Sequence, residues 1–380
     1  MVRPSWLDGK LVKLSWVSLL QDAASEMLYP IVPVLLNTVF GAPALVVGAI
    51  ESLAEGVAAL TKLLSGRINH FMSKRSMVIG GYGLAAVGKV LIALAGSWPI
   101  VMLGRVVDRF GKGMRSASRD AILLEGTETG HRGKIIGFHR TADNIGAVAG
   151  PAIALGLLSL FDNNLRPVLW IAAIPAAASV LVTLTLKGGE SKSNAASSKV
   201  SGSVPAPVNR LIVLVGIFSL VNFPDALVLL HLSQSGWGLS SVIGLYLLFN
   251  VSATAFSFPA GMISDRLSPK AVYSLGLLCF SLVYFGFSQT TDHNLEVFLV
   301  VLYGLFAAIN ETVGKSWVGK LAGGSSQLLA QSRLAGWSGF GVLFAGIWAG
   351  LAWGSTGTLP LLISGAVGAI VAVVSASIRT

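Results

Sequence analysis

Apolar stretches of about twenty residues recur along nearly the whole chain. We place twelve of them, at residues 14–39, 44–65, 77–95, 99–114, 135–159, 168–186, 211–233, 240–262, 271–287, 297–313, 335–353 and 359–377. A stretch of roughly twenty apolar residues is long enough to cross the hydrocarbon core of a bilayer as a helix. The pattern therefore predicts an all-α membrane protein with twelve transmembrane helices.

The composition agrees with a location in the lipid bilayer. Of the 380 residues 53% are hydrophobic and only 12% are charged, whereas about 25% are charged in soluble domains. The first stretch carries Asp22 and Glu26 and is not followed by a small-residue cleavage site, so we expect a retained span and not a signal peptide. The single cysteine, Cys279, falls inside a predicted span. The sequence thus offers no metal-ligand spacing, and we expect neither a metal nor another cofactor.

The basic residues of the loops gather on one side of the predicted membrane. They lie on the side of the N-terminus, and Arg166 alone falls on the other side. Cytoplasmic loops carry the excess of Lys and Arg, so both termini are predicted to be cytoplasmic in a bacterial inner membrane. The net charge of +10 then reflects topology and requires no nucleic-acid partner.

The chain divides into two halves around a polar segment. Residues 187–209 are rich in Ser, Lys, Gly and Ala, a composition typical of a flexible linker. We therefore predict six-helix bundles at residues 1–187 and 210–380, joined by a cytoplasmic linker at 188–209. The decapeptide GRINHFMSKR at 66–75 follows the second span, and GMISDRLSPK at 261–270 follows the eighth. Their separation of about half the chain indicates a duplicated six-span unit with a transport path between the two copies.

Both decapeptides resemble the loop motif of the major facilitator superfamily. In that motif a glycine, an apolar residue, an aspartate, an arginine and a terminal basic residue recur after the second and eighth helices. The copy at 261–270 matches well, whereas the copy at 66–75 has His70 at the usual aspartate. The resemblance implies a fold of two pseudo-symmetric six-helix bundles. It also implies that both loops contribute gating residues, namely Gly66, Arg67, Lys74, Arg75, Gly261, Asp265 and Arg266.

The fifth span carries a second motif. Gly137, Gly146, Gly150 and Pro151 follow the spacing glycine, eight residues, glycine, three residues, Gly-Pro. This spacing resembles the motif that marks exporters and antiporters in the same superfamily, and so implies export. Gly146 and Gly150 would present a bare helix face for close packing, and Pro151 would bend the helix by removing a backbone donor. Ordinary small-residue packing would give the same pattern, so both interpretations stay open.

Ionisable residues are numerous inside the predicted spans of the N-terminal half. The set comprises Asp22, Glu26, Glu51, Glu55, Lys62, Lys89, Arg105, Asp108, Arg109, Lys112, Arg140 and Asp143. Arg105 also resembles an intramembrane arginine motif of the superfamily. Charges inside a membrane are costly, so we expect these residues to face the bundle interior or a wet cavity and to pair there. The C-terminal half is sparser, and its candidates are Asn222, Asp225, Asn310 and Glu311.

Proton coupling requires a carboxylate that exchanges its proton as the cavity opens to alternate sides. Glu26, near the middle of the first span, is our first candidate, and Asp22 lies one turn away on the same helix face. The predicted cavity set is completed by Glu51, Glu55, Arg105, Asp108, Asn222, Asp225, Asn310 and Glu311. We assign Arg140 and Asp143, near the cytoplasmic end of the fifth span, to gating. For each acid the alternative is a fixed ion pair that holds two helices in register.

Together these features predict secondary active export by alternating access, with proton antiport. The predicted cargo is a small polar or charged organic molecule, such as a siderophore, a metal chelate, an amino-acid derivative, an organic ion or a drug. The expected partners are this cargo, protons and the lipid bilayer, and the protein is expected to act as a monomer. An importer or uniporter, a lipid flippase, and a membrane receptor or scaffold are the alternatives. No loop offers a nucleophile with a placed base, so an enzyme is not predicted.

Overall fold

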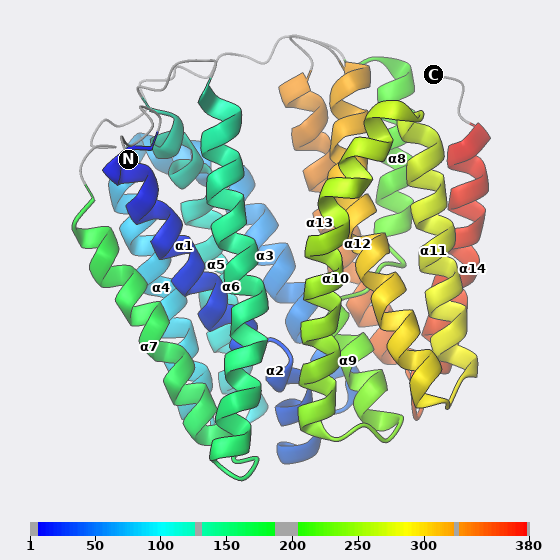
Figure 1. Cartoon of the computed structure of the whole chain (residues 1–380), viewed down its shortest axis with the longest axis horizontal. Coiled ribbons are helices and arrows are strands. Elements are labelled where there is room, and N and C mark those ends of the chain that lie inside the picture. The colour runs from blue at the N-terminus through cyan, green and yellow to red at the C-terminus, as the bar shows by residue number, and fades with distance from the viewer. Residues whose placement is uncertain (1–6, 126–130, 187–203, 323–326, 378–380) are drawn as a thin grey trace. The chain divides into compact units, whose positions relative to one another are not determined.

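Helices make up almost all of the described chain, which comprises residues 7–125, 131–186, 204–322 and 327–377 of a computed structural model (Figure 1). No strand occurs in these ranges. The chain forms two compact units. The N-terminal unit holds the helices up to residue 40 and those between residue 53 and the predicted linker. The C-terminal unit holds Gly41–Ser52 together with the helices that follow the linker.

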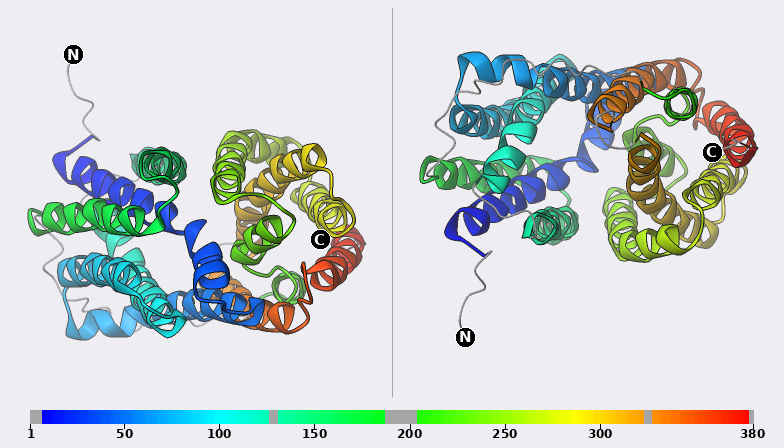
Figure 2. Two further views of the ribbon diagram at one scale, coloured as in Figure 1. Left: turned by 90° about the horizontal axis from the view of Figure 1, so that it is seen from below. Right: turned by 90° about the horizontal axis from the view of Figure 1, so that it is seen from above.

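The N-terminal unit is a set of packed helices. Its elements are α1 (Gly9–Leu28), α2 (Ile31–Val34), the π-helical turn η1 (Leu35–Val39), α3 (Ala44–Phe71), α4 (Lys74–Leu94), α5 (Trp98–Leu124), α6 (Arg132–Leu160) and α7 (Leu165–Leu184). The start of α3, up to Ser52, belongs to the C-terminal unit. The main packing pairs are α4 with α5 and α1 with α6, and α7 packs against both α1 and α4. Figure 2 shows these helices nearly end-on.

The C-terminal unit has an aromatic core. Its elements are α8 (Ala206–Ser219), α9 (Asp225–Gln234), α10 (Leu239–Arg266), α11 (Pro269–Gln289), α12 (His293–Ala322), α13 (Gln327–Leu351) and α14 (Thr358–Ser377). Phe218 meets the edge of Phe280 with 4.9 Å between ring centroids, and Phe280 lies 4.9 Å from Phe306. These three buried rings join α8, α11 and α12. Such edge-to-face and tilted pairs are favourable beyond the area that they bury.

The predicted spans correspond closely to the helices. Within the described ranges ten helical stretches are long and apolar enough to cross a membrane. The other two predicted spans are α5, which is too rich in charge to qualify, and the seventh span, which is split into α8 and α9. Most of the predicted linker lies outside the described residues, but residues 206–209 form the first turn of α8. Pro207 suits that turn because the first helical residues have no partner for a backbone N–H.

The prediction of one continuous seventh span is wrong, because the helix is interrupted at residues 220–224. Pro224 causes the interruption, since proline has no N–H and disfavours a helical conformation in the residue before it. The interruption frees two backbone carbonyls. Trp348 Nε1 donates to the Leu220 carbonyl at 2.6 Å, and Ser364 Oγ donates to the Val221 carbonyl at 2.7 Å. Side chains from α13 and α14 thus replace the missing backbone donors, as a lipid environment requires.

Replacing Ser364 with alanine is expected to lower the free energy of unfolding by about 1–3 kcal/mol, because it leaves the buried Val221 carbonyl without this donor. Ser364 is completely buried. Ser377→Ala on the same helix is the matched control, since the Ser377 hydroxyl is exposed and donates to the Val373 carbonyl of its own helix. Unfolding in mixed micelles measures both variants. Equal stabilities would show that the carbonyl does not need the serine.

Candidate functional site

The glycines of the fifth-span motif bring α6 against the part of α1 that carries the two candidate carboxylates. A Cβ atom built on Gly146 would lie 3.1 Å from the Asp22 Cβ, and one built on Gly150 would lie 2.9 Å from the Glu26 Cβ. Any larger side chain would push the helices apart. Both carboxylates are half-buried. In contrast, no described atom lies within 4 Å of a Cβ built on Gly137, so this glycine does not pack against another helix.

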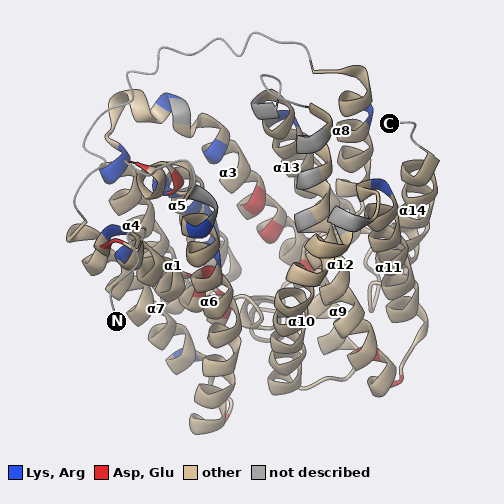
Figure 3. Ribbon diagram, turned by 45° about the horizontal axis from the view of Figure 1, so that its top comes forward, with Lys and Arg blue, Asp and Glu red and all other residues tan. Residues whose placement is uncertain are grey.

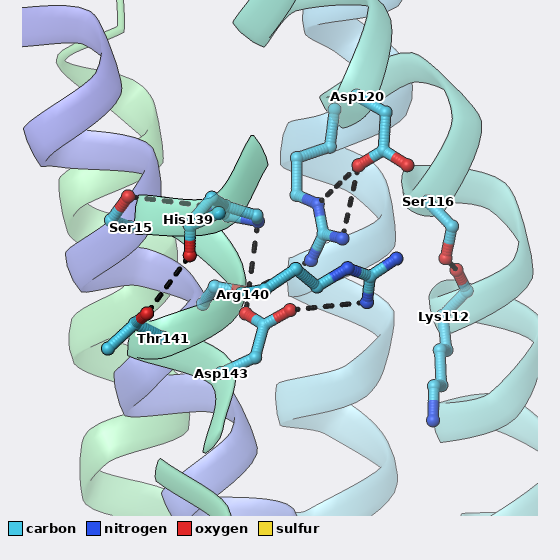
Figure 4. A network of polar contacts seen from close by, with 11 residues as sticks. Ser15, Lys112, Ser116, Asp120, His139, Arg140, Thr141 and Asp143 are labelled. Carbon is cyan, nitrogen blue, oxygen red and sulfur yellow. Dashed lines mark hydrogen bonds and ion pairs between the residues drawn. The ribbon is translucent and has the colours of Figure 1, made fainter. Parts of the chain in front are cut away.

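Asp22 lies within a mixed network of charges on α1, α5 and α6. It interacts electrostatically with Asp143 on α6 and with three cations of α5, namely Lys112, Arg115 and Arg119. Asp143 in turn lies 3.5 Å from Arg140 and 3.8 Å from the buried His139 (Figure 4). Arg119 interacts electrostatically with both Asp22 and Asp143, so the two acids share a cation. Both acids contribute to one charged cluster.

Two hydroxyl groups of α1 extend this cluster. Ser18 Oγ accepts a hydrogen bond from Arg119 Nη1 at 2.9 Å, and Ser15 Oγ lies 3.3 Å from His139 Nδ1. Arg119 also contacts Asp120 at 3.1 Å. The cluster therefore connects α1 to α5 and to α6 through side chains as well as through close backbone packing.

Two other predicted cavity residues, Asp108 and Glu55, form ion pairs between helices. Lys89 Nζ of α4 lies 2.9 Å from Asp108 Oδ1 of α5, and the two side chains are only 1% and 6% exposed. Arg109 of α5 lies 3.1 Å from Glu55 of α3. For Asp108 and Glu55 this geometry fits the alternative in which the acid holds two helices in register. Figure 3 shows charged residues spread over α5 and its neighbours.

Two buried arginines of α5 lie over aromatic rings. The Arg105 guanidinium is 5.5 Å from the centroid of Tyr29, and that of Arg115 is 4.5 Å from the centroid of Tyr82. Cation–π contacts of this kind help to hold a desolvated cation. Neither tyrosine was predictable as a partner, since nothing in the local sequence shows which ring faces which cation.

The candidate residues of the C-terminal unit lie in several different elements. Asp225 begins α9, directly after the interruption, and Tyr303 donates a hydrogen bond to its Oδ1 at 2.6 Å. Asn222 lies in the interruption and Asn310 in α12, and both are half-buried. Glu51 is buried beside Ser52, whose hydroxyl bonds to the Val342 carbonyl. The side chain of Glu311 lies outside the described residues.

The gating candidates of the two decapeptide motifs lie near helix ends. Arg67 is exposed near the end of α3, Lys74 begins α4, and Arg75 donates to the Leu184 carbonyl at 3.2 Å. Lys74 also lines a polar pocket with Ser65, Asn69, Ala117, Ser118 and Ala121. Gly261 lies in α10 with no described atom within 4 Å of a built Cβ. The side chains of Asp265 and Arg266, and the surroundings of Gly66, lie outside the described residues.

A further buried polar group, which was not among the predicted site residues, lies at the start of α12. Glu296 is completely buried and accepts a hydrogen bond from Trp237 Nε1 at 2.5 Å. In the part of the chain that the structure describes, no group of His, Cys, Asp and Glu is arranged to hold a metal ion.

The arrangement of the helices and the comparisons with known proteins define a membrane transporter. The sequence model of the Major Facilitator Superfamily matches residues 14–251. The chain therefore belongs to the major facilitator superfamily, and the predicted family and fold class are confirmed.

Relatives and solved structures agree with this assignment. An uncharacterised MFS-type transporter of Methanocaldococcus jannaschii is 28% identical over 325 residues, which cover 83% of this chain and 81% of the relative. The crystal structure of a mutant of the nucleoside transporter NupG covers 98% of this chain and 100% of its own, with a TM-score of 0.81 and 16% identity. A POT family transporter in complex with a thioalcohol-conjugated peptide covers 96% and 94%, with a TM-score of 0.80 and 13% identity. At these identities the structures show the fold alone.

Proposed function

We propose that this transporter exports a small polar or charged organic molecule by alternating access, in exchange for protons. One observation carries the proposal. The exporter-like glycines Gly146 and Gly150 pack α6 directly against the segment of α1 that bears Asp22 and Glu26. A movement of α6 relative to α1 would therefore change the surroundings of both carboxylates. Exchange of a proton needs such a change, because a carboxylate binds its proton more tightly when it is desolvated or meets a like charge.

The surrounding charges support a role in exchange. Asp22 interacts with Asp143 as well as with the cations of α5. A proton on one carboxylate would relieve the repulsion between the two acids, and a cation of α5 could then move to the other acid. Glu26, one turn further along α1, is the residue that we assign to proton transfer. Arg140 and Asp143 are assigned to gating, since they pair with each other in the N-terminal half of α6.

We further infer that the protein lies in a bacterial inner membrane with both termini in the cytoplasm. The loop Lys and Arg residues support this orientation. Gating on that side by Gly66, Arg67, Lys74 and Arg75, at the end of α3 and the start of α4, is part of the same proposal. The corresponding gating residues of the C-terminal unit are proposed to be Gly261, Asp265 and Arg266. The protein is proposed to work as a monomer.

Transport assays in inside-out membrane vesicles test the proposal. A proton gradient is generated by respiration, and compounds from a library of siderophores, amino-acid derivatives, organic ions and drugs are added one at a time. An exporter that exchanges protons will accumulate its cargo in the vesicles, and an uncoupler will abolish the accumulation. Uptake that ignores the uncoupler would indicate uniport and contradict the proposal.

A further inference from the structure

A buried histidine lies between α1 and the charged part of α6. His139 belongs to α6 and is only 1% exposed. Its Nδ1 atom lies 3.3 Å from the Ser15 hydroxyl of α1, and its Nε2 atom lies 3.8 Å from Oδ1 of Asp143, one turn further along α6 (Figure 4). The imidazole therefore has a hydroxyl group on one side and a carboxylate on the other.

The contact with Asp143 is too long for a hydrogen bond. His139 Nε2 and Asp143 Oδ1 are both buried, and neither has a hydrogen-bond partner among the described residues. Buried polar atoms nearly always have a partner, so this unpaired couple requires an explanation. A neutral imidazole has one donor nitrogen, and a donor at Nε2 would draw the carboxylate oxygen to about 2.7–2.9 Å. The longer distance therefore fits Nδ1 as the donor to Ser15, with two facing acceptors, Nε2 and Oδ1, that one added proton would join.

The missing hydrogen bond can form without a movement of any helix. His139 and Asp143 are four residues apart on α6 and so lie on the same helix face. Rotation of the two side chains is enough to bring Nε2 and Oδ1 together once Nε2 carries a proton. A hydrogen bond between an imidazolium and a carboxylate is charge-assisted and roughly twice as strong as a neutral one. The geometry of the pair therefore suits the binding of one proton.

The charges around His139 leave Asp143 as the acid available to it. The groups that face the imidazole are Ser15 of α1, Arg119 and Asp120 of α5, and Arg140 and Asp143 of α6. Arg119 and Asp120 pair with each other at 3.1 Å. Arg140 contacts Asp143 through the other carboxylate oxygen, Oδ2, from an exposed position. An imidazolium adds one positive charge to this set, and Asp143 Oδ1 lies close enough to compensate it.

We propose that His139 carries protons for this transporter, with Nε2 as the binding atom and Asp143 as its partner. Uptake takes a proton from the solvent and forms the Nε2–H bond of an imidazolium. Transfer breaks that bond, forms an O–H bond on Asp143 and restores the neutral imidazole. Asp143 interacts with Asp22 of α1, so the relay ends beside the acids to which we assign proton exchange. That this proton is exchanged for cargo rests on the proposed function, whereas the proton site itself does not.

Nuclear magnetic resonance of the detergent-purified full chain, with ¹⁵N-labelled histidine, tests the proton site without a cargo. A charge-assisted hydrogen bond moves the resonance of its N–H proton downfield. We expect such a resonance from His139 to appear on acidification within about pH 8 to 5, the range in which imidazole commonly titrates. Its loss in His139→Gln assigns it. His293→Gln is the matched control that keeps it, because His293 is exposed and belongs to the other unit.

Two variants identify the partner of the proton. Asp143→Asn removes the carboxylate and is expected to abolish the downfield resonance, whereas the control Asp292→Asn keeps it, because Asp292 is exposed in the other unit. Ser15→Ala removes the contact at Nδ1 and is also expected to keep the resonance. The absence of a downfield resonance in the wild type, or its persistence in Asp143→Asn, would overturn the proposal. If Asp143→Asn does not fold, loss of the resonance in Ser15→Ala overturns it, since the proton would then belong to Nδ1.

The vesicle assay tests the role of His139 in transport. His139→Gln is expected to slow proton-driven accumulation of cargo by at least about 10-fold, since a positioned acid–base group speeds proton transfer roughly 100- to 10,000-fold. A wild-type rate in His139→Gln would refute its role as a carrier. The proposed function fails differently. A wild type that shows the resonance but exchanges no cargo for protons would refute proton-coupled export and leave the proton site standing, and coupled export without the resonance would do the reverse.

Discussion

Replacing Lys89 with methionine is expected to lower the free energy of unfolding by about 3 kcal/mol, because it leaves the buried carboxylate of Asp108 without its nearest cation. The Lys89 Nζ atom lies 2.9 Å from Asp108 Oδ1, and both side chains are almost completely buried. Breaking a buried pair costs about 3–5 kcal/mol. We expect the lower part of that range, since Arg105 and Arg109 also act on Asp108. Unfolding in mixed micelles measures the loss.

A double variant and an exposed control make this prediction specific. Lys89→Met combined with Asp108→Asn removes both charges and is expected to recover most of the stability, since a buried pair often contributes little net stability. Lys134→Met is the control, because Lys134 is exposed at the start of α6. If Lys89→Met is as stable as the wild type, the pair does not hold α4 and α5 together, and Asp108 returns to the set of candidates for proton exchange.

Gly150→Ala is expected to destabilise the protein by about 1–3 kcal/mol, the usual cost of adding a group to a packed interface. The new methyl group would lie 2.6 Å from the Ala23 carbonyl oxygen and 2.9 Å from the Glu26 Cβ. The helices α1 and α6 must then separate, which also displaces Glu26. We therefore expect proton-coupled transport to fall together with stability, as measured by unfolding and by the vesicle assay.

The same motif supplies the control for Gly150→Ala. No described atom lies within 4 Å of a Cβ built on Gly137. Gly137→Ala is therefore expected to be neutral or to stabilise the helix by up to about 1 kcal/mol, since alanine has the higher helix propensity. Equal losses in the two variants would mean that both glycines act through backbone flexibility. The close contact between α1 and α6 would then not explain the motif.

The fold was predictable because lipid restricts the possible structures so strongly. A span must satisfy its backbone hydrogen bonds internally, so a long apolar stretch of sequence is almost always a helix. The interruption of the seventh span was not predicted, because hydropathy does not reveal a short break between two apolar segments. Pro224 was the available signal. Pro224 disfavours a helical conformation at Phe223 and has no N–H to pair a carbonyl of the preceding turn. This predicts a helix that starts at Asp225.

The pairing of the charged residues could not be predicted from the sequence. Lys89 and Asp108 belong to different helices, and their contact depends on how α4 and α5 are rotated about their axes. Close packing of two glycines fixes that rotation, because a Cβ on Gly104 would lie 2.7 Å from the Gly88 carbonyl oxygen. Likewise, Tyr303 reaches Asp225 across 78 residues of sequence. Helical periodicity predicts only neighbours within one helix.

Proton release from the detergent-purified protein tests the central claim most directly, as the cargo library is titrated into the wild type and into Glu26→Gln. Glu125→Gln is the control, because Glu125 is exposed at the end of α5. We expect the wild type and the control to release protons when a cargo binds, and Glu26→Gln to bind the same cargo without releasing any. Cargo-dependent proton release that survives in Glu26→Gln would contradict the assignment of proton exchange to the carboxylate beside Gly150.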